Sequence, residues 1–158
     1  MKNKTLATWL ALVLGPLGMH RFYLYGWRDT LGWLMIVPTL LGWYGYQRVE
    51  EFGLDDTLSW VLLPILGFHL AAICLTAIVY GLMKKEEWNG KFNPDASPEQ
   101  AAGQTSWTTI GAIVISLMLG TVFLLSGLAY SFQRYFEYTT PPIQSEPSTL
   151  ESSATSAR

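Results

Sequence analysis

Charged residues are scarce in this sequence. Asp, Glu, Lys and Arg make up 14% of its 158 residues, whereas hydrophobic residues make up 50%. A soluble domain usually carries about 25% charged residues. The shortage is also uneven, because the charges gather in short stretches between long neutral segments. This distribution argues against a soluble domain and is typical of a membrane protein whose charges mark the ends of its spans.

Residues that perform chemistry are scarce as well. The apolar segments contain no Asp or Glu, and the single cysteine, Cys74, lies five residues from His69 and so on a different face of a helix. A metal site needs several ligands that converge on one point, and a proton-coupled carrier usually needs an acid inside the membrane. The sequence therefore predicts no catalytic residue, no metal site and no cofactor, and we do not expect an enzyme.

Three further absences concern the partners, the repeats and the N-terminus. The net charge of −2 is too small to favour nucleic acid as a partner. We recognise no internal repeat with a period of about 20–50 residues. Lys2 and Lys4 precede an apolar run as in a signal peptide, but no small-x-small cleavage site follows. We therefore interpret the run as a retained first span.

Four apolar segments dominate the chain: residues 5–19, 30–47, 58–83 and 107–132. About 20 helical residues cross the hydrocarbon core of a bilayer. The last two segments exceed that length, the second is slightly short, and the first would be only about 23 Å long. The first helix must therefore thin the bilayer or continue past Arg21. We predict an all-α integral membrane bundle with four transmembrane helices.

These segments divide the chain into three parts. The parts are a helical hairpin at residues 2–47, two further spans at residues 48–138 with a polar connection at 84–106, and a tail at residues 139–158. The tail is rich in Ser, Thr and Pro and is predicted to be disordered. Within the polar connection, we expect Trp88 and Phe92 to lie against the membrane surface.

Small residues recur every four positions on three of the predicted helices. The sets are Ala7, Ala11 and Gly15 in the first helix, Gly67 and Ala71 in the third, and Ala112, Ser116 and Gly120 in the last. This spacing lets helix backbones approach closely in lipid. We therefore interpret these sets as packing surfaces.

Four spans would place both termini on one side of the membrane. That side would hold Lys2, Lys4, Arg48 and Arg134, and the other side would hold Arg21, Arg28, Lys84, Lys85 and Lys91. These numbers are too similar for the positive-inside rule to decide the orientation. The adjacent pair Lys84 and Lys85 favours a cytoplasmic location for its own connection and for the one that contains Arg21.

The stretch "LGPLGMHRFYLYG" ends the first segment and opens the connection after it. It resembles the signature of the TM2 domain family, in which a membrane helix ends in a glycine-rich stretch, followed by His-Arg-Phe-Tyr-Leu-Gly and a second helix. The matching residues are Gly15, Gly18, His20, Arg21, Phe22, Tyr23 and Leu24. Two positions depart from the pattern: Tyr25 replaces the glycine after the leucine, and no acidic residue precedes Glu50 in the second helix.

The resemblance implies a fold and no particular activity. It covers about residues 2–47 and implies a hairpin of two membrane helices. A TM2 pair followed by two further spans and a polar tail is similar to the layout of bacterial inner-membrane proteins. The resemblance thus implies a multi-pass protein of the bacterial inner membrane.

The motif suggests how the hairpin is anchored. Gly15 and Gly18 flank a proline and permit close packing, and we expect Asp29 to cap the second helix. The Arg21 guanidinium can bind phosphate oxygens with two parallel hydrogen bonds. Two interpretations stay open: the motif only anchors a tight hairpin, or Arg21 also binds a lipid headgroup or a partner.

A second candidate site is His69, which lies deep in the third segment. An ionisable residue inside a membrane often has a function. Alternatively, a neutral imidazole there forms a hydrogen bond to a hydroxyl or a backbone carbonyl of a neighbouring helix.

Three classes of function are compatible with these features. The first is a non-enzymatic membrane protein that interacts with membrane lipid, with other membrane proteins or with copies of itself. The second is a small oligomeric transporter or channel, whose candidate lining residues are Thr39, His69, Thr76, Ser116 and Thr121. The third, a membrane enzyme that acts on lipid, is disfavoured by the missing catalytic cluster. We favour the first.

Overall fold

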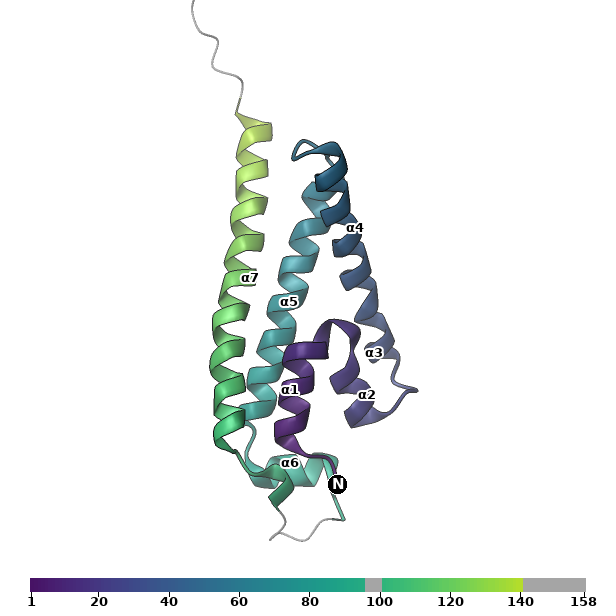
Figure 1. Ribbon diagram of the computed structural model, residues 1–158, viewed down its shortest axis with the longest axis vertical. Coiled ribbons are helices and arrows are strands. Elements are labelled where there is room, and N and C mark those ends of the chain that lie inside the picture. The colour runs from purple at the N-terminus through teal and green to yellow at the C-terminus, as the bar shows by residue number, and fades with distance from the viewer. Residues whose placement is uncertain (96–100, 141–158) are drawn as a thin grey trace, which may run out of the picture.

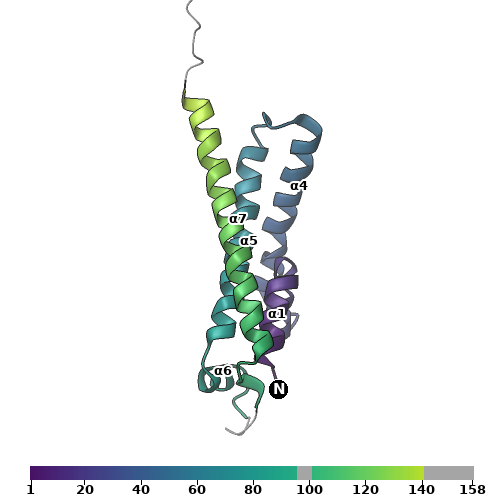
Figure 2. The same ribbon diagram turned by 60° about the vertical axis from the view of Figure 1, so that its left-hand side comes forward.

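The protein is an elongated helical bundle. The computed structural model describes residues 1–95 and 101–140, and every regular element in these ranges is a helix, as the all-α prediction requires. Helices α5 (Ser59–Leu82) and α7 (Trp107–Thr139) pack along their lengths, and α4 (Ile36–Phe52) packs against α5 (Figure 1). Short helices gather at the end where the N-terminus lies (Figures 1 and 2). We call this end the base and the opposite end the top.

Among the described helices, α5 and α7 are long and apolar enough to cross a membrane. The segment predicted at residues 58–83 matches α5 closely. Helix α7 continues beyond the predicted end at residue 132, and in this extension Gln133 and Arg134 each donate a hydrogen bond to Glu137, at 2.9 and 2.6 Å. The predicted tail therefore begins inside α7, and its residues 141–158 lie outside the described part of the chain.

The prediction of one helix over residues 5–19 is wrong. Helix α1 (Lys4–Leu14) leads into a short 3-10 turn, η1 (Gly15–Leu17), and the chain then reverses at Gly18, whose φ is +70°. Helix α2 (Met19–Tyr25) returns beside α1 to the base (Figure 1). Residues with a side chain rarely adopt this left-handed backbone. The first helix therefore ends because of a glycine and not because the apolar sequence runs out.

The second predicted segment forms two helices rather than one. Helix α3 (Thr30–Leu34) and α4 are separated by a break at Met35. Pro38 accounts for the break, since it has no N–H to donate to the carbonyl of Leu34, four residues earlier. Together α3 and α4 rise from the base to the top, whereas the α1–α2 hairpin stays within the lower half of the bundle (Figures 1 and 2).

Helix α6 (Lys85–Phe92) lies across the base (Figure 1), and a second 3-10 turn, η2 (Ala101–Gly103), follows it. The expectation that Trp88 and Phe92 lie against the membrane surface is wrong. They are 0% and 6% exposed, and their rings pack on Tyr80 of α5 at centroid distances of 6.0 and 6.4 Å. Because these two residues are four apart, they share the inner face of α6 and close the core from below.

Small residues set the helix contacts, as predicted. A Cβ added to Gly67 of α5 would lie 3.2 Å from the Cα of Gly127 in α7, and one added to Gly120 would lie 2.9 Å from the Cβ of Cys74. Ala7 of α1 is fully buried at the interface with the rest of the bundle. Small residues therefore let the helix backbones approach closely, and elsewhere a glycine makes room for a large side chain of the next helix, as Gly42 does for Leu66.

Candidate functional site

The predicted motif residues lie on both sides of the reversal at Gly18. His20 and Leu24 face the core and are 0% and 1% exposed. The ring of Phe22 lies 5.3 Å from that of Trp33 in α3 and stacks on Trp27, in the connection before α3, at a centroid distance of 5.1 Å. The hydroxyl of Tyr23 accepts a hydrogen bond from the N–H of Asn3, at 2.8 Å, and so ties α2 to the start of α1. The motif thus forms a packed helix instead of an extended connection.

The two motif glycines mark points where no side chain would fit. A Cβ on Gly15 would collide with the side chain of Ile73 in α5, and a Cβ on Gly18 would collide with the backbone carbonyl of Gly32 in α3. The hydroxyl of Thr39 also donates a hydrogen bond to the Pro16 carbonyl, at 2.8 Å. The tip of the hairpin is therefore fixed between α3, α4 and α5.

His20 is the most deeply buried polar side chain of the motif. Its ring lies 5.9 Å from that of Tyr80, and neither ring nitrogen has a hydrogen-bond partner within the described ranges. Leaving such a group without a partner is costly in free energy. The side chain faces the core and is not available to a headgroup at the surface.

Arg21 faces outward and is held by Asp29. Its Nε and Nη2 atoms donate to the two carboxylate oxygens at 2.5 and 3.3 Å, and its guanidinium carbon lies 4.9 Å from the centre of the Tyr25 ring. Asp29 also accepts the backbone N–H of Gly32 at 2.9 Å, which confirms that it caps α3. The guanidinium beside Asp29 holds the pKa of that carboxyl below its usual range. The ion pair closes the turn between α2 and α3.

The same turn occurs a second time in the chain. Residues 21–33 and 48–60 align without a gap at a spacing of 27 residues, and Arg, Gly, Asp, Thr, Leu and Trp recur at matching positions. We call them the first and the second Arg–Asp turn. The chain therefore contains a short repeat at a spacing of 27 residues, and the expectation of no repeat with a period of about 20–50 residues is wrong. The repeat covers only a short connection and not a whole helix, so helix periodicity does not indicate it. The signal that identifies it is the Arg-x4-Gly-x2-Asp spacing that both connections share.

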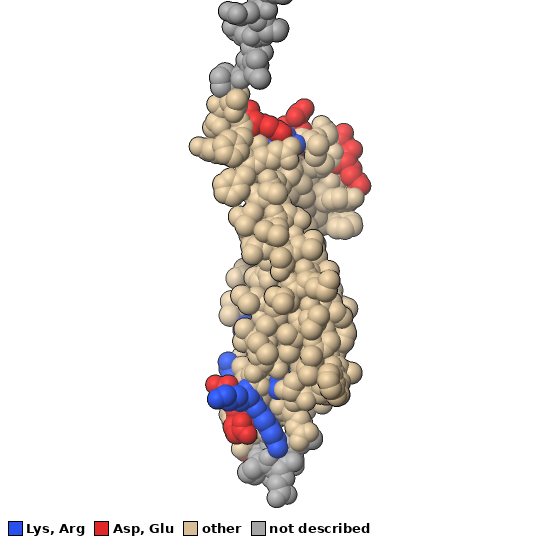
Figure 3. Space-filling view, turned by 90° about the vertical axis from the view of Figure 1, so that its left-hand side faces the viewer, with Lys and Arg blue, Asp and Glu red and all other residues tan. Residues whose placement is uncertain are grey.

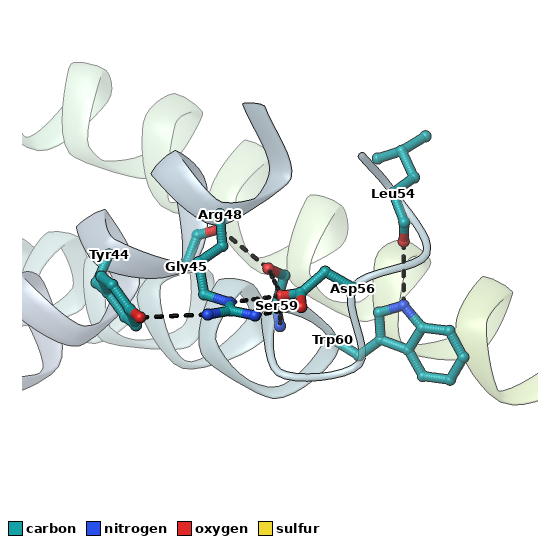
Figure 4. A network of polar contacts seen from close by, with 7 residues as sticks. All are labelled: Tyr44, Gly45, Arg48, Leu54, Asp56, Ser59 and Trp60. Atoms are coloured by element: carbon teal, nitrogen blue, oxygen red, sulfur yellow. Dashed lines mark hydrogen bonds and ion pairs between the residues drawn. The ribbon is translucent and has the colours of Figure 1, made fainter. Parts of the chain in front are cut away.

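The geometry of the second Arg–Asp turn repeats that of the first (Figure 4). Arg48 donates to both oxygens of Asp56, from Nε at 2.9 Å and from Nη2 at 2.7 Å, and Asp56 accepts the N–H of Ser59 at 3.0 Å. Gly53 ends α4 with φ +81°, as Gly26 ends α2 with φ +88°.

Each turn also uses a tryptophan in the same way. The indole N–H of Trp60 bonds to the carbonyl six residues earlier at 3.1 Å, and that of Trp33 does so at 3.0 Å. The Arg48 guanidinium keeps the pKa of Asp56 well below its usual range. The chain thus uses one device at the base and again at the top to reverse its direction.

The two sites predicted from sequence, Arg21 and His69, meet in one groove. The groove has a volume of about 450 Å³ and runs along the outer face of α3 and α4. Its remaining lining is apolar and consists of Leu31, Leu34, Met35, Val37, Pro38 and Leu41. His69 borders this groove together with Met35, which lies at the break between α3 and α4, and its Nε2 atom has no hydrogen-bond partner among the described residues.

Two lysines near the N-terminus have a structural role that the sequence did not reveal. The ammonium of Lys4 is 1% exposed and donates to the Met83 carbonyl at the end of α5, at 2.9 Å, and to the Thr105 hydroxyl at 2.6 Å. The ammonium of Lys2 donates to the Leu24 carbonyl at the end of α2. Cations at helix C-termini are favoured because the last carbonyls are unpaired and carry partial negative charge.

Charge is confined to the two ends of the bundle. One face of the molecule shows an uncharged middle, with mostly acidic side chains at the top and with both basic and acidic side chains at the base (Figure 3). Large apolar side chains are exposed along this middle zone, for example Leu117, Val122 and Leu125 of α7. A surface of this kind fits lipid better than water.

The other polar side chains proposed to line a pore, Thr76, Ser116 and Thr121, do not border the groove that His69 borders. Thr76 and Thr121 donate to carbonyls of their own helices at 2.9 and 2.8 Å. Ser116 and Thr121 border a second groove between α5 and α7, separate from the groove that His69 borders. In residues 1–95 and 101–140, no three His, Cys, Asp or Glu side chains come together as ligands for a metal ion.

Comparison with known proteins identifies the first part of the chain. Residues 1–46 match the model of the TM2 domain, as the resemblance of the His-Arg-Phe-Tyr-Leu run implied. The match contains α1, α2, α3 and most of α4, and therefore the whole of the first Arg–Asp turn. No curated protein and no solved structure matches the chain.

Proposed function

Given that residues 1–46 form a TM2 domain, we propose that the chain is a multi-pass integral membrane protein without enzymatic activity, which acts by binding membrane lipid or other membrane proteins. The observation that carries the proposal is the band of exposed apolar side chains between two charged ends (Figure 3). The two candidate spans α5 and α7 lie in this band.

The proposed topology has three spans and one re-entrant hairpin. The spans are α3 with α4, α5, and α7. Residues 30–52 would extend about 34 Å at 1.5 Å per residue, enough for the hydrocarbon core. Helix α1, with 11 residues, would extend only about 16 Å. The α1–α2 hairpin would thus enter the membrane from the base and return to it, and the two termini would lie on opposite sides.

This topology gives a clear orientation. Among the described residues, the base holds Lys2, Lys4, Arg21, Arg28, Lys84, Lys85 and Lys91, whereas the top holds Arg48 and Arg134. Positive residues near the ends of spans favour the cytoplasmic side. We therefore place the base in the cytoplasm, in a bacterial inner membrane. A four-span topology distributes the basic residues almost evenly between the two sides, because it makes the first helix cross the membrane and so moves Lys2 and Lys4 to the side of Arg48.

The way in which the motif side chains are used supports a binding role over catalysis. Arg21 is held by Asp29, and His20 is packed in the core. A general acid or base must reach a bound substrate. In the groove, Arg21 instead adds one fixed cation to an apolar surface, which suits an amphipathic ligand.

Crosslinking in native membranes tests the proposal. The chain, carrying a photoreactive residue in place of Leu34 or Leu117, is expected to remain in the membrane after carbonate extraction and to form adducts with lipid or with defined membrane proteins. Extraction by carbonate would contradict the membrane location. Turnover of a membrane lipid by the purified chain would contradict the non-enzymatic role.

The alternative of a small oligomeric transporter or channel has less support, because its candidate lining residues border different grooves or bond to their own helices. Flux of ions or solutes into liposomes that contain the purified chain, abolished by His69→Ala, would establish this alternative in place of our proposal.

A further inference from the structure

We propose that the groove beside Arg21 binds one anionic phospholipid from the leaflet at the base, with the phosphate at the Arg21 guanidinium and an acyl chain along α3 and α4. This inference deepens the proposed function and rests on its membrane location. It assigns one ligand to the two residues, Arg21 and His69, that border the groove.

The Arg21 guanidinium is fixed and only partly used. Asp29 accepts from Nε and Nη2, and Nη1 has no hydrogen-bond partner among the residues that the structure describes. The ion pair already holds the guanidinium in one orientation, so a ligand that binds there does not have to order a free side chain. The exposed Arg28 lies in the same turn, so the connection carries a net positive charge when Arg21 and Asp29 are both ionised. A phosphate oxygen can therefore accept a hydrogen bond from Nη1, and the net positive charge of the connection attracts it.

The apolar part of the groove has the direction and length of an acyl chain. Its lining extends from Leu31, near the base, to Leu41 in α4. At 1.5 Å per residue, these positions are about 15 Å apart along the helices. The groove thus leads from the depth of the connection, where headgroups lie, toward the middle of the bundle.

A lipid chain fits this space better than a helix of another protein. The groove holds about 450 Å³. A helix about 10 Å in diameter would fill roughly 1,200 Å³ over a length of 15 Å. A partner helix could only cover the groove, whereas a single hydrocarbon chain can lie within it. The fixed cation at one end selects an anionic headgroup by charge complementarity.

The second Arg–Asp turn provides an internal control. Arg48 forms the same ion pair with Asp56, but its connection also carries Glu50, Glu51 and Asp55. These acids give the connection a net negative charge, which repels phosphate. Replacing Arg48 therefore removes an equivalent ion pair from the fold but does not affect the proposed headgroup site.

The test measures which lipids stay bound to the purified full chain. Native mass spectrometry is done after equilibration with mixed micelles of equal amounts of phosphatidylglycerol and phosphatidylcholine. The chain is expected to retain one phosphatidylglycerol, with at least a tenfold preference. Arg21→Gln should remove the preference, and Leu34→Trp, which fills the groove from an exposed position, should remove the bound lipid. Arg48→Gln should retain both the lipid and the preference.

Each contrary outcome is specific to this inference. Equal loss in Arg21→Gln and Arg48→Gln would show that the ion pair matters only for folding, and unchanged binding in Leu34→Trp would place the lipid elsewhere. Displacement of the lipid by millimolar inorganic phosphate would point to a free anion as the ligand. Carbonate-resistant membrane insertion in all variants would leave the proposed membrane function intact, so the two failures are distinguishable.

Discussion

Single basic residues in this chain act mainly at helix ends. Lys4 donates a hydrogen bond to the Met83 carbonyl at the end of α5, and Lys2 donates one to the Leu24 carbonyl at the end of α2. Sequence reasoning treated both as free charges that mark a membrane face, because the acceptors lie far away along the chain. Their position in the bundle explains how an almost fully buried ammonium is tolerated: it replaces water at carbonyls that would otherwise be unpaired.

Removing the ammonium of Lys4 should therefore destabilise the protein. Lys4→Met keeps an unbranched side chain but leaves the Met83 carbonyl and the Thr105 hydroxyl without their donor. We expect a loss of about 1–3 kcal/mol in the free energy of unfolding, measured by denaturation in detergent micelles. The exposed Lys84 is the control, and Lys84→Met should change stability by about 0.5 kcal/mol at most. Equal effects in the two variants would contradict this role.

The two turn aspartates predict a defined pH dependence. Arginine lowers the pKa of Asp29 and of Asp56, so the ionised pairs stabilise the fold above the unfolded pKa of about 3.9 and lose this effect as pH falls through the lower folded value. Asp29→Asn should lower the melting temperature equally from pH 8 to about pH 5.

Below about pH 4, the difference between Asp29→Asn and the parent chain should shrink. Asp56→Asn should behave in the same way, whereas Asp95→Asn, at an exposed site outside both turns, should not change the melting temperature. A difference that grows on acidification would contradict the ion-pair account.

At the scale of whole helices, the turn at Gly18 has the largest consequence. Its positive φ and its contact with the Gly32 carbonyl both require glycine. Gly18→Ala should cost about 2 kcal/mol or more, because it combines backbone strain with a collision. Gly26→Ala, at φ +88° and ψ 170° with open space around it, should cost at least about 1 kcal/mol from backbone strain alone. Gly111→Ala, in open space within α7, should be neutral or stabilising by up to about 1 kcal/mol.

Thermal unfolding of the three variants in one detergent gives this order directly. If Gly18→Ala unfolds at the same temperature as Gly111→Ala, the hairpin does not depend on the left-handed turn.

Helix prediction succeeded where length and hydropathy decide the outcome. α5 and the start of α7 lie where the apolar segments predicted them, because a long neutral run in this chain leaves no alternative to a helix. It failed at residues 5–19, since an apolar run shows where a chain can be buried and not where it reverses. One αL glycine decided that point. Trp88 and Phe92 were misplaced for a related reason: their aromatic character suits an interface, but their four-residue spacing brings both rings to the core.

The candidate site was predicted in its parts but not in its assembly. Arg21 and His69 were identified separately from their unusual positions in apolar sequence. Their common groove depends on the break at Met35, which Pro38 explains, and on the packing of α4 against α5, which no local pattern encodes. The second Arg–Asp turn, in contrast, was available from the sequence alone, because its spacing repeats that of the first without a gap.

For the molecule as a whole, the proposed re-entrant hairpin would determine which side of the membrane each end of the bundle occupies. Two helices that enter and return together would leave α3–α4, α5 and α7 as the spans of the proposed topology. An odd number of spans separates the termini, and it brings the N-terminal lysines to the same side as α6 (Figure 1). With an odd number of spans, more basic residues lie at the base than at the top. The leaflet at the base is then the one from which the groove beside Arg21 would take its lipid.

The most direct measurement is therefore the side of the N-terminus. In a Cys74→Ala background, single cysteines are placed after Met1, at Lys91, at Glu51 and at Thr140, and a membrane-impermeant maleimide is applied to right-side-out and to inverted vesicles. With a re-entrant hairpin, the first two cysteines should label together from the cytoplasmic face, and Glu51→Cys and Thr140→Cys should label from the opposite face. Labelling of the cysteine after Met1 from the same face as Glu51→Cys would show that the first helix crosses the membrane and would contradict the re-entrant hairpin.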